Sequence, residues 1–584
     1  MRHRLKLAAF LLAAALIAAG GAYRWPISSA YVRAEFGRQL ADAVGLTLRG
    51  PARAYLSLLP LPAIQLVDAE LDGADGAPVV AIPHAKARIA LGPLLAGRLR
   101  LSGALLRRPT VLVDLDRPPF ARDSALAKLI ANAATASETP LGALRVEGGL
   151  LHVVSRQDRL DTLFEDVSSE LDWPRFEDPA RLALRATWRG APITIAARLD
   201  APAKWLSEGG SPASVDVSSP LGGLKLSGAL KSDGKNAFEG EVDADFASTD
   251  ALARLFGGRP TGFPPNGRLA LRSKIALAPP TATLSDMRLA ALGQNLDGAL
   301  ALTRLASGWS LSGSLAADAL SLDDLFAKAP PLLEDGRWSA APLSLGDFGA
   351  VALDLRASIA QISWRGHALR DAALSLMAHD GRVTATLSEA TAYKGLLKGE
   401  ATIAPNERGL ELRVSASLAN ADIGALIADF GGTGYSGQGG GQFSVQASGD
   451  SPAALARALH GDASIAFGPG VIDGVSFEEA LRRSERRPIN LYADMRAGRT
   501  VFDEVEARAT IENGEAQVRS AAMIGPGVLV TLNGGADLAA RRLDAEFIAA
   551  RADQHGAPDP VGPEIHVTIS GPWARPVIKT NAGA

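Results

Sequence analysis

Alternation of apolar and polar residues with a period of two constrains the fold of this chain more than any other feature. Such stretches recur from about residue 60 onward, and the clearest lie at 181–189, 268–277, 351–359, 410–418, 504–511 and 565–569. Successive side chains of a strand point to opposite faces, so each stretch predicts a strand with one apolar and one solvated face, as in antiparallel sheets. Turn dipeptides of the hairpin type separate the strands, at Asp72-Gly73, Asp380-Gly381, Asn513-Gly514 and Asn533-Gly534.

Helices are expected to be few and short. The candidates lie at 124–136, 321–328, 423–430, 453–459 and 477–484. A weak internal repeat, in which a strand runs into a short helix, relates 242–255 to 414–427, with Asp250 and Asp422 at the position of a helix N-cap. The spacing of the similar segments is unequal, which predicts sheet modules with variable insertions and not a strict solenoid.

A sheet with one apolar face has to cover that face. Hydrophobic residues make up 47% of the 584 residues but aromatic residues only 5%, and the few short helices supply little covering material. Two arrangements stay open: two sheets packed as a sandwich, or a trough whose apolar face is covered by flexible acyl chains. In the second arrangement, the residues expected to line the groove are Val351, Leu353, Leu355, Leu410, Leu412, Val414 and Leu418.

The composition excludes several classes of site. The chain has no cysteine, so it cannot form thiolate zinc sites, iron–sulfur clusters or disulfides, and it has no cysteine nucleophile. Its net charge is −3, whereas nucleic-acid-binding proteins are usually basic. The eight histidines have no metal-binding spacing, and neither a Walker A nor a G-x-S-x-G motif occurs.

Two further motifs give little support for a catalytic or cofactor-binding site. A G-x-G-x-x-G pattern at 432–437 follows a predicted helix and not a strand, which predicts a glycine-rich turn and not a dinucleotide site. Asp243 and Asp245 share one face of a predicted strand, but nothing else in the sequence supports a catalytic carboxylate pair. We therefore expect no enzymatic activity, no cofactor, no metal and no nucleic-acid partner.

The first 23 residues predict a membrane anchor. Three basic residues within the first six precede an uncharged apolar run at 7–23, which orients the start of the chain to the cytoplasm. At about 1.5 Å per residue, the run is just long enough for a thin bilayer. The expected anchor residues are Leu7, Phe10, Leu11, Leu12, Leu16 and Ile17.

A cleaved signal peptide is the alternative, because Gly20 and Ala22 resemble a cleavage site. Interfacial residues that follow, Arg24, Trp25 and Tyr31, favour retention of the segment. Both interpretations place the rest of the chain across the inner membrane.

The order of several segments resembles that of the AsmA family of Gram-negative envelope proteins. The N-terminal block consists of LPLPAIQLVDAEL at 59–71, RIALGPLLAGRL at 88–99 and RPTVLV at 108–113. The C-terminal block is the stronger match, with GPGVIDGVSF at 468–477, TVFD at 500–503, IENG at 511–514, GADLAARRLD at 535–544 and ISGPWARP at 569–576.

The resemblance implies an inner-membrane-anchored periplasmic protein of envelope biogenesis, without catalytic residues. Family members are associated with outer-membrane assembly, protein targeting to that membrane and lipid homeostasis, and larger relatives resemble bridge-like lipid transfer proteins. The expected function is the handling of phospholipid through an apolar β-groove. The alternative is a periplasmic scaffold or regulator of outer-membrane protein assembly, with an envelope protein as its partner.

The expected fold is mainly β, with an N-terminal transmembrane helix followed by an elongated, twisted antiparallel sheet groove and a few short helices. The expected segments are a cytoplasmic tail at 1–6, the anchor at 7–23, and β regions at 24–200, 201–340 and 341–584.

Overall fold

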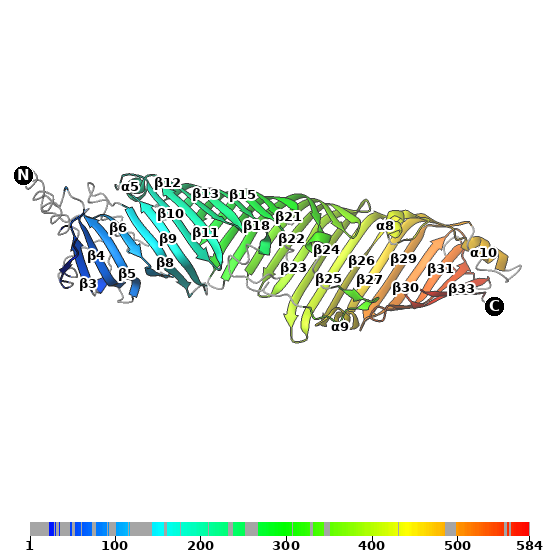
Figure 1. Cartoon of the computed structure of the whole chain (residues 1–584). Coiled ribbons are helices and arrows are strands. Elements are labelled where there is room, and N and C mark those ends of the chain that lie inside the picture. Colours follow the sequence, from blue (N-terminus) through cyan, green and yellow to red (C-terminus); the bar gives the residue numbers. More distant parts are fainter. Residues whose placement is uncertain are drawn as a thin grey trace, which may run out of the picture. The chain divides into compact units, whose positions relative to one another are not determined.

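The computed structural model of the chain describes residues between 21 and 582 (Figure 1). The longer segments outside the description are 1–20, 35–46, 93–100, 117–142, 251–266, 344–350 and 485–497, and shorter ones lie elsewhere in the chain. Two compact units make up the chain: unit 1 comprises residues 1–261 and 266–284, and unit 2 comprises 262–265 and 285–584.

Unit 1 is built on a sheet, and its described residues include the short helix α5 (Pro202–Ser207). Its strands are β1 (Trp25–Ile27), β2 (Thr47–Arg49), β3 (Arg53–Ser57), β4 (Ala63–Asp72), β5 (Pro78–Ile89), β6 (Leu101–Arg107), β7 (Thr110–Asp114), β8 (Ala143–Ser155), β9 (Leu160–Asp172), β10 (Ala180–Trp188), β11 (Ala191–Leu199), β12 (Gly210–Ser219), β13 (Gly222–Lys231), β14 (Phe238–Phe246) and β15 (Leu269–Ala278). A cluster of apolar side chains around Val167, Ala186 and Ile193 covers β9 to β11 on one face.

Strand β16 (Thr281–Ala291) belongs to unit 1 up to residue 284 and to unit 2 from residue 285. The other strands of unit 2 are β17 (Gln294–Leu305), β18 (Gly308–Ser321), β19 (Leu333–Glu334), β20 (Arg337–Trp338), β21 (Val351–Trp364), β22 (His367–His379), β23 (Arg382–Ala392), β24 (Gly395–Asn406), β25 (Gly409–Asp422), β26 (Tyr435–Gly449), β27 (His460–Asp473), β28 (Arg499–Phe502), β29 (Glu504–Glu512), β30 (Glu515–Gly525), β31 (Val528–Asp537), β32 (Arg542–Arg551), β33 (Glu564–Pro572) and β34 (Val577–Ala582). The prediction of a mainly β chain with few, short helices is confirmed.

The antiparallel prediction holds for most neighbouring strands but is wrong at two places. In unit 1, β8 pairs in parallel with both β6 and β7. In unit 2, β21 pairs in parallel with β18. Parallel neighbours need a long crossover between them, and the segments 115–142 and 322–350 supply that length.

The helices of unit 2 begin close to their predicted positions. They are α7 (Leu322–Leu325), α8 (Ile423–Asp429), α9 (Pro452–Arg457) and α10 (Phe477–Ser484). The Asp422 carboxylate accepts a hydrogen bond from the Ala425 N–H at 3.1 Å, so Asp422 caps α8 as predicted. The expected helix at 124–136 and the helix after Asp250 fall outside the described residues.

Two of the predicted turns are confirmed and one is wrong. Asp380-Gly381 and Asn513-Gly514 join hairpins, and both residues of each pair have positive φ. The prediction of a turn at Asn533-Gly534 is wrong, because both residues lie inside β31. Gly534 serves close strand approach instead: a Cβ atom there would lie 2.3 Å from the Asp544 carbonyl oxygen of β32.

The expected membrane anchor, with Leu7, Phe10, Leu11, Leu12, Leu16 and Ile17, lies outside the described residues. Within the described part of the chain, no helix is long and apolar enough to cross a membrane.

Candidate functional site

The predicted groove residues come together on one face of unit 2, which we call the apolar face. Side chains of directly opposite residues share a face of a sheet. One such row crosses five strands, from β21 to β25, through Leu355, Leu376, Ala385, Ala401 and Val414.

Neighbouring rows extend the apolar face in both directions along the strands. Leu353 belongs to a row that ends at Leu412, and Leu410 and Leu418 alternate with the other apolar residues of β25. The backbone of Val351 pairs with Trp309, but its side chain is not among those described. Six of the seven groove candidates therefore share one face, while their contact with lipid stays a prediction.

Much of the apolar face is open to solvent. Leu302 of β17, Phe443 of β26 and Ile465 of β27 are 39%, 41% and 42% exposed. In the described part of unit 2, the second sheet is the pair β19–β20, whose strands of two residues each are too short to cover β21 to β26. An open apolar area of this kind marks a binding surface in a folded protein.

Helix α10 covers the apolar face at the C-terminal strands (Figure 1). Ala480 and Leu481 are 0% and 1% exposed and pack in one cluster with Phe502, Val530 and Ile565. The start of α10 is held to β28, because the Phe477 N–H donates to the Thr500 hydroxyl at 3.1 Å and that hydroxyl donates to the Val475 carbonyl at 2.7 Å.

A cavity of about 370 Å³ lies on the apolar face between α8 and α10. Its walls come from α8, α10 and strands β26 to β32, and they include Ile427, Phe467, Phe477, Met523 and Phe547. The sequence reasoning missed this cavity. A signal was present, because four elements of this part of the chain, β27, α10, β28 and β32, each carry a cavity phenylalanine: Phe467, Phe477, Phe502 and Phe547.

Helix α8 is fixed beside the cavity by polar contacts at its end. The His367 Nδ1 atom of β22 lies 2.9 Å from the Asp429 Oδ2 atom, the last residue of α8. The hydrogen bond from His367, together with one from Tyr393, lowers the pKa of the Asp429 carboxyl below its usual value. The Asp429 carboxylate therefore stays ionised to a lower pH than that of an isolated aspartate.

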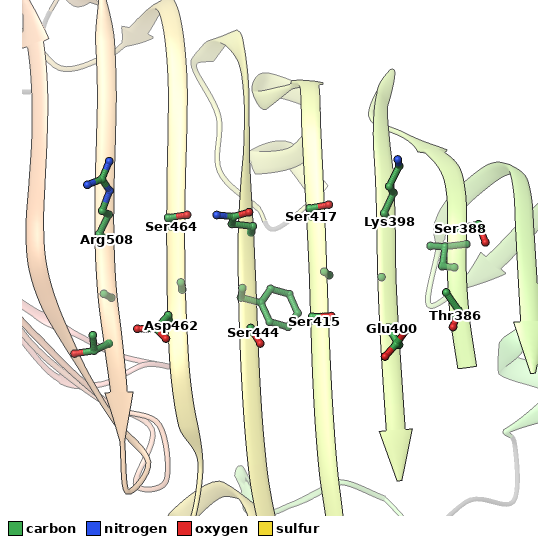
Figure 2. A pocket seen from close by; sticks show the side chains of 18 of the residues that line it. Thr386, Ser388, Lys398, Glu400, Ser415, Ser417, Ser444, Asp462, Ser464 and Arg508 are labelled. Atoms are coloured by element: carbon green, nitrogen blue, oxygen red, sulfur yellow. The ribbon is translucent and has the colours of Figure 1, made fainter. Parts of the chain in front are cut away.

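The opposite face of the same strands is polar. A trough of about 860 Å³ lies over β23 to β30. Its lining includes both the hydroxyl and charged residues labelled in Figure 2, Thr386, Ser388, Lys398, Glu400, Ser415, Ser417, Ser444, Asp462, Ser464 and Arg508, and residues that alternate with them, Leu387, Ala416, Phe443, Ala463 and Ala509. Ser415 and Ser417 alternate with Val414 along β25, so they point away from the apolar face. The two faces of these strands thus differ sharply in polarity.

Several of the other charged residues form ion pairs across neighbouring strands. Asp243 and Asp245 pair with Arg272 and Arg268, each with a contact of 3.0 Å to a guanidinium nitrogen, and so do not form a carboxylate pair. Among the described residues, no group of three or more histidine, aspartate or glutamate side chains could hold a metal ion.

His566 of β33 lies between two carboxylates. Its Nδ1 atom is 2.9 Å from Glu546 and its Nε2 atom is 3.3 Å from Glu564. The hydrogen bond with Glu546, with a further contribution from Glu564, raises the pKa of the His566 imidazole.

We expect this pair of contacts to make stability depend on pH. A raised pKa in the folded state stabilises the protein fully below the ordinary histidine pKa of about 6.5, and the stabilisation is lost as the pH rises through the folded value. His566→Gln should therefore lower the melting temperature by roughly 1–2 °C at pH 5.5 and by much less at pH 9, for a pair worth about 0.5 kcal/mol. His379→Gln is the control, because His379 lies at the end of β22 and its partner, Asp380 at 3.1 Å, is 87% exposed. An equal loss at both pH values in His566→Gln would contradict the assignment.

Comparison with known proteins gives one match. The chain has no match among curated proteins and none among solved structures. Residues 294–521, which include β17 to β29, match the model of the AsmA family, and this match confirms the family resemblance predicted from the sequence.

Proposed function

We propose that this chain is a non-enzymatic factor of envelope biogenesis that handles phospholipid on the apolar face of unit 2. The observation that carries the proposal is the open apolar face, where residues such as Phe443 remain 41% exposed in a long row of apolar side chains. Acyl chains suit such a surface because each Å² of apolar area removed from water contributes about 25 cal/mol, without a need for directional contacts. The AsmA family match covers the same strands, which supports a role in the envelope.

The proposal includes a location. The basic flank and apolar run at the N-terminus would anchor the chain in the inner membrane, with the bulk of the protein in the periplasm. There, the apolar face would shield acyl chains from water while the polar face stays hydrated. An envelope protein that receives the lipid is the expected partner.

One observation favours a second candidate, a scaffold for outer-membrane protein assembly. Strand β34 pairs only with β33 among the described strands, and Val577 on it is 51% exposed. Such an edge can pair with a strand of another protein. In that case, the apolar face would contact protein and not lipid.

Photocrosslinking in living cells tests the two candidates against each other. A photoreactive benzoylphenylalanine at Leu412, on the apolar face, should yield phospholipid adducts roughly tenfold more often than one at Arg413, because only the first contacts acyl chains. The adducts are identified by mass spectrometry of the full chain purified from the inner membrane. Protein adducts alone at Leu412 would refute lipid handling and support the scaffold.

A further inference from the structure

The cavity between α8 and α10 lies at the closed end of the apolar face. Its volume of about 370 Å³ falls in the lower part of the range of small-molecule pockets. On the side of the C-terminal strands, α10 closes it, with Ala480 and Leu481 buried against β32 and β33. Helix α10 therefore forms a wall on that side of the cavity.

The lining of the cavity includes no lysine, arginine or histidine, and its polar residues are Tyr435, Ser436, Thr531 and Glu506. Glu506 is the one ionisable carboxylate among its lining residues, but Glu506 lies on the polar face, opposite Ala466 and Ala522, and pairs with Arg508 at 3.7 Å. The other walls are mostly isoleucine, valine, alanine, methionine and phenylalanine side chains. A phosphate headgroup inside would lose its water without a cation to pair with.

A row of directly paired residues joins the groove candidates to this cavity. Leu418 lies opposite Gly441 of β26, and Gly441 lies opposite Ile465, which lines the cavity. A Cβ atom on Gly441 would lie 3.0 Å from the Ile465 side chain, and one on the neighbouring Gly439 would lie 2.4 Å from the Phe467 ring. The Ile465 and Phe467 side chains therefore lie over the two glycines and continue the apolar surface from Leu418 toward the cavity.

We infer that the cavity receives the terminal methyl end of one acyl chain, whose ester end and headgroup stay on the open part of the apolar face. This inference rests on the proposed function, because it takes phospholipid as the ligand, and it adds a direction: the lipid enters tail first and stops against α10. The walls that define the stop are Phe467, Ala507 and Ala521 of the sheet together with Ile427 of α8 and Phe477 of α10.

Two phosphatidylethanolamine probes test the inference on the full chain. One carries a diazirine at the terminal carbon of an acyl chain, and the other carries it near the ester. The terminal probe should label the cavity walls, Phe467 and Ala521 among them, and the ester probe should label the open face around Leu412 and Leu418. Equal distributions of the two labels would overturn the tail-first orientation. Absence of label from both places would overturn the proposed function as well.

A cavity-filling substitution tests the same site independently. Ala507→Phe adds a ring inside the cavity and should lower labelling of its walls by the terminal probe by roughly tenfold, with labelling of the open face retained. Ala466→Phe is the matched control, because Ala466 is exposed on the polar face of the neighbouring strand β27. Unchanged labelling in Ala507→Phe would refute the inference. If that variant folds poorly, the distribution of the two probes on the unsubstituted chain still decides.

Discussion

Val414→Asp is expected to remove bound phospholipid while leaving the protein folded. Val414 lies on the apolar face between Ala401 and Val445, and no cation faces it in these rows. An ionised carboxylate there would lose its water on contact with acyl chains, and that cost exceeds the few kcal/mol that apolar contact contributes. We expect a loss of co-purifying phospholipid of at least roughly tenfold. Mass spectrometry of the purified protein measures it, alongside complementation of an envelope-permeability defect.

Ser417→Asp is the matched control on the same strand. Ser417 lies on the polar face, directly opposite Lys398, so the new carboxylate would meet a cation in water. This variant should keep its lipid and its function. If Val414→Asp retained its phospholipid, the apolar face would not be the lipid site. If Val414→Asp lost the protein itself, the face would be a packed core, as in the sandwich arrangement.

Leu481→Ala is expected to release α10 from the sheet. The Leu481 side chain is 1% exposed and packs against Val530, Ala549 and Ile565. Truncation of a buried leucine to alanine costs about 2–5 kcal/mol, because apolar contacts are lost and a cavity remains. An eight-residue helix has little stability without such packing. Hydrogen exchange of α10 should therefore accelerate by at least roughly tenfold, as followed by mass spectrometry.

Glu478→Ala provides the control for this prediction, since Glu478 is exposed in the first turn of the same helix. It should change exchange in α10 only slightly. Because α10 forms one wall of the cavity, Leu481→Ala should also increase exchange in β32 and β33, which it covers. Unchanged protection of α10 in Leu481→Ala would show that this contact does not hold the helix.

Local patterns determined the strands and their two faces. The alternation of Leu412 and Val414 with Arg413 places apolar and charged residues on opposite sides of β25, whichever strands lie beside it. The positions of helices could also be predicted from the sequence, because helix caps depend on contacts within a few residues. Asp422 caps α8, and α10 spans 477–484 as predicted. The resemblance to the AsmA family rested on the order of such local segments.

Only the tertiary structure decided which strands are neighbours and what covers them. The parallel return of β21 to β18, and the place of Asn533-Gly534 inside β31, depend on pairing between distant parts of the chain. The cavity depends on the docking of α10 onto β32 and β33, where Leu481 meets Ile565. A period of two specifies which side of a strand is apolar, but it carries no information about what packs there. That choice depends on the free energy of long-range burial, which no local pattern encodes.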